Sequence, residues 1–205
     1  VHKLLPSVTS KFTPDITIAS QDDTNSLDGN LPDKIAEIEG VESAFGMMTR
    51  TAFSVEVNGN ETEIDLFSLD TFKKSVISGD ISRVYEDGNY AMAVYNQDYR
   101  LSVGDKIKTG NQELEIVCVT SEGVGSVSGA PTVVCSEKTF MRLTGECRFA
   151  MISVVLKKDV SEAAVSKIRD LVGDCLFVDN REENSDINGS YWVFRIASYG
   201  FLAII

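Results

Sequence analysis

The run Leu101-Ser-Val-Gly-Asp-Lys-Ile107 is followed closely by Thr109-Gly-Asn-Gln-Glu-Leu-Glu-Ile-Val-Cys-Val119. Gly-Asp at 104–105 and Gly-Asn at 110–111 are residue pairs that favour turns. The apolar residues on either side of the second turn predict a hairpin between strands at 106–109 and 113–120. Further turn signals recur at short intervals over residues 76–148. This segment is therefore predicted to be a mostly-β module, closed by a short helix at 137–143.

Upstream of the module, residues 15–48 have the pattern of a strand, a helix and a second strand. Asp15-Ile-Thr-Ile-Ala19 alternates with a period of two, which is typical of a strand. A helix is expected next, with Asn30 as its N-cap, Pro32 in its first turn and Gly40 after its end. Its apolar face would consist of Leu31, Ile35 and Ile38. An extended segment at 41–48 follows.

Downstream of the module, residues 149–178 repeat this order. A strand at 149–156 precedes a helix that we expect to start with a capping box of Asp159 and Glu162 and to end at Gly173. Its apolar stripe would consist of Val165, Ile168 and Leu171. A last strand is predicted at 175–178. Two strand–helix–strand units commonly build one split βαβ, ferredoxin-like sheet with the helices on a single face. If the similarity is more than coincidence, Ile35 and Ile168 should face the same sheet.

Two more segments have legible patterns. Asn58-Gly59 is a strong turn pair, and it predicts a hairpin between strands at 51–57 and 61–67. The C-terminal run 191–205 is almost wholly apolar, but it is shorter than the roughly 20 residues that a spanning helix needs. It could be a buried terminal helix or strand, or the first turns of a transmembrane helix. The aromatic residues at its start, Tyr191, Trp192 and Phe194, suit a membrane–water interface and favour the second interpretation.

Composition narrows the class of partner. The 205 residues are 43% hydrophobic and 24% charged, which is ordinary for a globular protein with a real core. The net charge is −12, and no cluster of lysines and arginines interrupts the acidic composition. Such a surface repels phosphate backbones, so we expect no nucleic-acid partner.

The cysteines suggest little chemistry. The four cysteines form no Cys-x-x-Cys pair, so a zinc site is not expected, although a disulfide between two of them stays open. Thr132-Val-Val-Cys135 with Arg142 downstream loosely resembles the strand-end cysteine and arginine of sortase transpeptidases. Such a thiol enzyme also needs a histidine, and His2 is the only one. A structural cysteine at the end of a strand is the better interpretation of Cys135.

Metal and phosphate loops are also poorly supported. The loop before Gly29 offers Thr24, Ser26 and Asp28, which is too few carboxylates for a calcium site of the EF-hand type. The loop around Gly189 offers Asn184, Asp186 and Asn188, but Arg195 stands where the closing glutamate should be. Residues 123–129 are rich in glycine and serine, but no Lys-Ser/Thr pair follows as in a phosphate-binding loop. We therefore assign no catalytic, cofactor-binding or metal-binding residues, and no cofactor.

The order of these elements is similar to that of one family. It looks like the extracytoplasmic domain of a MacB/FtsX-like ABC transporter permease, and the resemblance extends from Asp15 to the apolar tail. It rests on the order and spacing of five phrases rather than on any one of them: Asp15-Ile-Thr-Ile, the Pro32 to Val41 helix, Gly79-Asp-Ile81, the Leu101 to Val119 hairpin and Phe140-Met-Arg-Leu-Thr-Gly145.

The resemblance implies an α+β fold with two parts. Residues 1–75 and 149–190 would form a split, ferredoxin-like "porter" subdomain, and 76–148 an inserted, β-rich "sabre" subdomain. Residues 191–205 would be a stalk that enters a transmembrane helix.

The resemblance also implies a function. The domain would be non-catalytic and would lie on the outer side of the cell membrane, in a permease that pairs with a second permease and with an ABC ATPase subunit. It would couple ATP-driven motion to the export or handling of a peptide, an antibiotic or a lipoprotein. No residues match a docking hairpin for an outer-membrane tunnel, so a Gram-positive-like permease is an equal expectation. The alternative is an independent extracellular module that binds a peptide or a cell-wall fragment.

Overall fold

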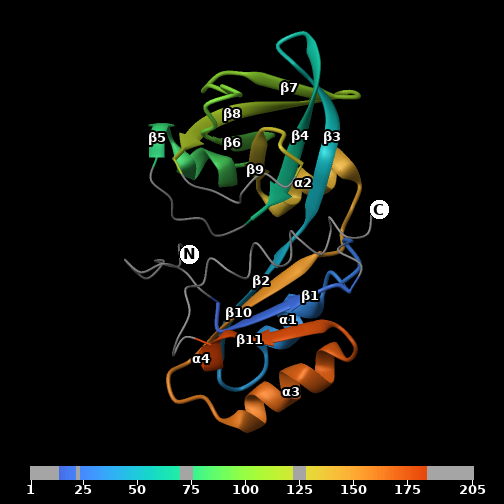
Figure 1. The fold of residues 1–205 in the computed structure, drawn as a ribbon, viewed down its shortest axis with the longest axis vertical. Helices are drawn as coiled ribbons and strands as arrows, with labels where there is room; N and C mark the ends of the chain where they lie inside the picture. The colour runs from blue at the N-terminus through green and yellow to red at the C-terminus, as the bar shows by residue number, and fades with distance from the viewer. Residues whose placement is uncertain (1–13, 22–23, 70–75, 122–127, 184–205) are drawn as a thin grey trace.

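A computed structural model describes residues 14–21, 24–69, 76–121 and 128–183. The molecule is elongated and mixed α+β, with two sheets placed one above the other along its long axis (Figure 1). The seven-stranded sheet occupies the upper half of Figure 1, and the four-stranded sheet lies below it with α1 and α3.

The four-stranded sheet contains both predicted strand–helix–strand units. Its strands are β1 (Ile16–Ala19), β2 (Val41–Met47), β10 (Met151–Leu156) and β11 (Leu176–Asp179). They are antiparallel, in the order β11-β1-β10-β2. Helix α1 (Leu31–Ala36) joins β1 to β2, and α3 (Glu162–Val172) joins β10 to β11.

One face of this sheet forms a core with both helices. Ile16 and Ile18 of β1 lie opposite Val154 and Ile152 of β10, and all four side chains are fully buried. They belong to one apolar cluster that also contains Ile35 of α1 and Ile168 of α3. The loop after α1 packs against the start of α3, because a Cβ added at Gly40 would lie 2.6 Å from the Val160 side chain and 3.4 Å from that of Ala164. The prediction that Ile35 and Ile168 face the same sheet is therefore confirmed.

The ends and faces of the two helices differ from the predictions. Asp159 has a left-handed backbone with φ of 62°, and α3 begins after Ser161 with no side-chain cap, so the capping box is wrong. Leu171 is 42% exposed, and Val172 is buried in its place. The reason is helical period, because Val165, Ile168 and Val172 follow the i, i+3, i+7 spacing of one face.

Asn30 occupies the N-cap position of α1, but its side chain makes no capping bond. Its backbone N–H instead donates to Asp28 Oδ1 at 2.9 Å, so an Asx turn at Asp28 supports this end of the helix. The helix also stops at Ala36, before the predicted glycine at position 40.

The seven-stranded sheet has the order β5-β8-β6-β9-β4-β3-β7. Its strands are β3 (Thr49–Val57), β4 (Asn60–Ser68), β5 (Val76–Gly79), β6 (Tyr90–Val94), β7 (Lys106–Thr109), β8 (Gln112–Thr120) and β9 (Thr132–Cys135). Strand β7 also pairs with β8, which closes the sheet into a ring with β5 outside it. The remaining helices are the 3-10 turn η1 (Ile81–Tyr85), α2 (Glu137–Thr144) and the short α4 (Asn180–Glu183).

Both predicted hairpins are present. Asn58 and Gly59 have φ of 48° and 88°, as a two-residue turn between β3 and β4 requires. Lys106 to Thr109 of β7 pair with Gln112 to Glu115 of β8. The predicted short helix also forms as α2, capped by Ser136 at its start and by Gly145, with φ of 75°, at its end.

The β3–β4 hairpin lies in a different sheet from the one expected. The sequence division grouped it with residues 1–75, but β4 pairs with β9 and β3 pairs with β7, so the hairpin is part of the seven-stranded sheet. The chain passes from one sheet to the other at Met48, between β2 and β3. No loop separates β2 from β3, so nothing in the local pattern shows that the chain changes sheets there.

Candidate functional site at the junction of the two sheets

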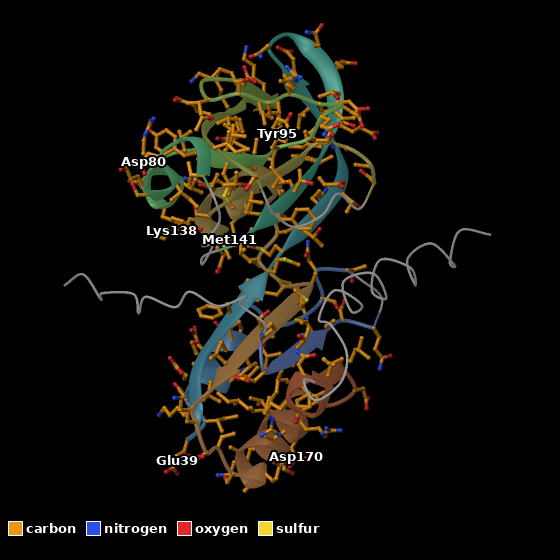
Figure 2. All side chains as sticks on the ribbon, turned by 60° about the vertical axis from the view of Figure 1, so that its left-hand side comes forward. Glu39, Asp80, Tyr95, Lys138, Met141 and Asp170 are labelled. Carbon is orange, nitrogen blue, oxygen red and sulfur yellow. The ribbon has the colours of Figure 1, made fainter. Side chains whose placement is uncertain are left out.

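Two connections join the sheets, and we call the residues around them the junction: Asn25, Gly46, Met48 to Arg50, Ser68, Glu146 and Phe149. The first connection is Met48, which is fully buried. Its N–H donates to Ser68 Oγ at 2.8 Å, and its carbonyl accepts from the Ser68 N–H at 2.9 Å. The second runs from the end of α2 to the start of β10. Figure 2 places Lys138 and Met141 of α2 just above the narrow middle of the molecule.

A polar clamp holds the start of β3. Asn25 Oδ1 accepts the Thr49 N–H at 3.0 Å, and Asn25 Nδ2 donates to the Thr49 carbonyl at 2.8 Å. The Asn25 amide also donates to Glu146, whose carboxylate forms an ion pair with Arg50. The Arg50 side chain is 47% exposed, so we attribute the rigidity of the clamp mainly to the amide bonds rather than to the ion pair.

An aromatic ring packs directly on a strand at the junction. Phe149 is 2% exposed, and its N–H and carbonyl both bond to Leu27, at 2.9 and 2.8 Å. A Cβ added at Gly46 of β2 would lie 2.3 Å from this ring. Only a glycine allows the ring to lie so close to the strand, and the backbone bonds fix the ring in place.

The two ends of the described fold meet at one point of the four-stranded sheet. The Asn180 N–H donates to the Asp15 carbonyl at 2.8 Å, and its side chain donates to the Pro14 carbonyl at 2.9 Å. Asp15 Oδ2 accepts from the Leu156 N–H at 2.7 Å. A shallow cavity of about 290 Å³ lies here, lined by Asp15, residues 156–160 and Arg181. The chain thus enters and leaves this fold side by side.

An arginine–aspartate pair holds the outgoing segment. Arg181 donates to the Asp179 carboxylate from Nε at 2.9 Å and from Nη2 at 2.6 Å, and these bonds are the main reason that the pKa of Asp179 is lowered. A carboxyl group with a lowered pKa in the folded state stabilises the fold above its unfolded pKa of about 3.9, and the contribution is lost as the pH falls through the folded value.

We therefore expect Arg181→Met to lower the free energy of unfolding at neutral pH. The free energies of unfolding of the variant and the wild type should converge as the pH falls below about 3.9. Urea unfolding over a pH series measures this difference. Lys167→Met, on an exposed side chain of α3, is the matched control and should leave the pH dependence unchanged. A gap between Arg181→Met and wild type that stays constant down to strong acid would contradict the linkage.

The structure places the thiol candidates in the core. Cys135 is fully buried at the end of β9, and its thiol is 3.8 Å from the Phe67 carbonyl. Arg142 bonds instead to the Gly88 carbonyl and to Thr139 Oγ1. Burial also raises the pKa of the Cys118 thiol. None of the four cysteines, all of which are described, forms a disulfide in the structure, and Cys147 is the exposed one. His2 lies outside the described residues.

The loop at Gly29 is a turn. The Asp28 carboxylate accepts the Asn30 N–H, which is the main reason that its pKa is lowered, and it lies 3.8 Å from Lys34 Nζ. Within the described ranges, no three potential metal-ligand side chains lie together. The Gly189 loop and residues 123–127 of the Gly/Ser loop lie outside those ranges.

Sequence reasoning missed the junction itself. An isolated glycine within a strand pattern, as at position 46, is a sign of close approach by a neighbour and could have been noticed. Asn25 and Glu146 carry no such sign, because each is a common polar residue in a predicted loop.

No protein-family model and no curated protein matches the chain. Solved structures do. The periplasmic region of MacB from Actinobacillus actinomycetemcomitans aligns with a TM-score of 0.62 at 12% identity, over 85% of this chain and 94% of that one. The chain has the fold of the MacB periplasmic region.

The extracellular domain of YknZ, a noncanonic ABC-type transporter from Gram-positive bacteria, is similar as well. It aligns with a TM-score of 0.56 at 12% identity, over 84% of this chain and 95% of that one. The fold of this chain is thus similar to that of a periplasmic region and to that of the extracellular domain of an ABC-type transporter. Within the described part of the chain, no helix has the length and apolar character to cross a bilayer.

Proposed function

We propose that the chain is the non-catalytic extracytoplasmic domain of a MacB/FtsX-like ABC transporter permease. It couples ATP-driven motion of a partner ATPase to the export or handling of a peptide, antibiotic or lipoprotein substrate outside the membrane. The observation that carries the proposal is the meeting of the two ends of the described fold, at Asp15 and Asn180, at one point of a MacB-like fold. Two flanking transmembrane helices could both reach the fold there.

We assign a part to each sheet. The four-stranded sheet with α1 and α3 is the split βαβ, porter-like subdomain, because its two central strands each begin a strand–helix–strand unit. The ring of the seven-stranded sheet is the sabre-like subdomain. In this assignment the first boundary lies near Met48 rather than at residue 75. Residues 191–205 lead into a transmembrane helix.

The junction fits a role in transmitting motion. One apolar cluster runs from Ile16 in the four-stranded sheet to Phe140 in α2, so the two sheets share a core. The Asn25 clamp ties the segment after β1 to the start of β3, and the Phe149 ring packs the second connection against β2. Movement of membrane helices at Asp15 and Asn180 would therefore move the closed seven-stranded sheet as well. Two such permeases, each with an ATPase, would move their outer domains against each other.

Labelling of Cys147 tests the location of the domain. Cys147 is an exposed free thiol, whereas Cys118 and Cys135 are buried. Cys175 is only partly buried, so the test uses a Cys175→Ser background. In spheroplasts that express this full-length parent chain, we expect a membrane-impermeant maleimide to label Cys147 without permeabilisation. A Cys147→Ser variant is the control and should lose that label. Labelling that appears only after permeabilisation would sink the proposal. A parent chain that labels but carries no flanking membrane segments would fit the binding-module alternative instead.

A further inference from the structure

The strand that leaves the junction contains a strained bend. In β3, Arg50 pairs with Leu66 of β4 and Phe53 pairs with Ile64, so two residues of β3 face Asp65 alone. This is a β-bulge, which bends a strand and redirects it. Ala52, the second of the two residues, has φ of 48°, a left-handed conformation that is unfavourable for alanine. Backbone strain of this kind persists only where surrounding contacts enforce it.

A buried carboxylate enforces the bend. Asp65 is fully buried, and its Oδ1 accepts the Ala52 N–H at 3.1 Å. The same carboxylate accepts the Ser128 hydroxyl at 2.7 Å and the Ser128 N–H at 2.9 Å. The Asp65 backbone N–H donates to the Pro131 carbonyl at 2.9 Å. One side chain thus ties the bulge of β3 to the segment that leads into β9.

The bend lies within β3, between its clamped start and the end that pairs with β7. Thr49 bonds to Asn25 and Arg50 to Glu146, so the residues before the bulge are fixed to the junction. Thr49 and Arg50 also pair with β4, whereas the residues after the bulge pair with β4 and, at Glu56 and Val57, with β7. Figure 1 shows β3 curving away from β2 as it enters the upper sheet. The angle of the bulge therefore affects the orientation of the closed seven-stranded sheet.

We infer that Asp65 is a latch: it holds the strained bend at Ala52 and thereby sets the orientation of the seven-stranded sheet relative to the four-stranded sheet. The inference deepens the proposed mechanical function. Its test in the intact transporter rests on that function, whereas its test in the isolated chain does not.

Spin-label distances in the isolated 205-residue chain test the latch. Labels at Lys108→Cys in β7 and Asp170→Cys in α3 report the orientation of the two sheets, in a Cys147→Ser/Cys175→Ser background. Asp65→Asn keeps the shape of the side chain, but with the amide oxygen at the Oδ1 position its NH2 faces the Ser128 N–H and cannot accept it. We expect this variant to broaden the distance distribution and to shift its mean by several ångström. Asp98→Asn, on an exposed loop of the same sheet, should leave the distribution unchanged.

A second variant keeps the test valid if Asp65→Asn folds poorly. Ala52→Gly removes the cost of the left-handed backbone, so the bend no longer depends on the latch alone. We expect the double variant Ala52→Gly/Asp65→Asn to recover part of the melting temperature and part of the distance that Asp65→Asn alone loses. Folded Asp65→Asn protein with the wild-type distribution would overturn the inference. So would a double variant as displaced as Asp65→Asn alone.

The intact permease, reconstituted with its ATPase, gives the second arm. The same label pair is measured without nucleotide and after vanadate trapping. We expect trapping to shift the distance in wild type and to shift it less in Asp65→Asn. If the isolated chain shows the latch but trapping moves nothing in wild type, the latch stands and the coupling function fails. If trapping shifts both proteins equally, the latch has no part in coupling and the inference fails in that arm.

Discussion

Replacing Gly46 by valine is expected to lower the free energy of unfolding by about 3 kcal/mol, near the upper end for overpacked cores. The first added carbon would lie 2.3 Å from the Phe149 ring. The ring cannot move away cheaply, because it is buried and because its backbone bonds to Leu27 on both sides. Either β2 or the second connection between the sheets must therefore shift.

Urea unfolding at a constant m value measures this loss as a change in the midpoint. Ser43→Val, on the same strand, is the matched control. Ser43 lies opposite Val155 and is only partly buried, so valine there should be close to neutral. If Gly46→Val costs no more than Ser43→Val, the ring does not constrain the junction as described.

Much of the four-stranded sheet could be predicted because its chemistry is local. Alternation in 15–19 and 149–156 places apolar residues on one face of each strand, and the buried Ile152 and Val154 follow it. Turn pairs such as Asn58-Gly59 act within a few residues, so the hairpins were also legible. The faces of short helices are less secure, because a stripe chosen by spacing of three alone reaches Leu171 instead of Val172.

The boundary and the junction could not be predicted because they depend on contacts distant in sequence. Met48 continues the apolar pattern of β2, so nothing local shows that the chain changes sheets there. Asn25 bonds to a strand 24 residues away, and Glu146 lies 96 residues from Arg50. Asp65 shows the same limit, since a carboxylate within a strand pattern suggests an exposed face until its partners are known.

Truncating the ring itself is expected to be the most damaging change at the junction. Phe149→Ala should cost about 3–5 kcal/mol, because it removes a fully packed aromatic ring and leaves a cavity against β2. In combination with Gly46→Val the loss should be smaller than the sum, by about 1–2 kcal/mol, because valine then enters the space that the ring has left. A double-mutant cycle in urea isolates this term. Phe67→Ala provides the control cycle, since Phe67 belongs to a separate apolar cluster and should add to Gly46→Val without coupling. Equal coupling in the two cycles would mean that Gly46 acts through general stability and not through its contact with the Phe149 ring.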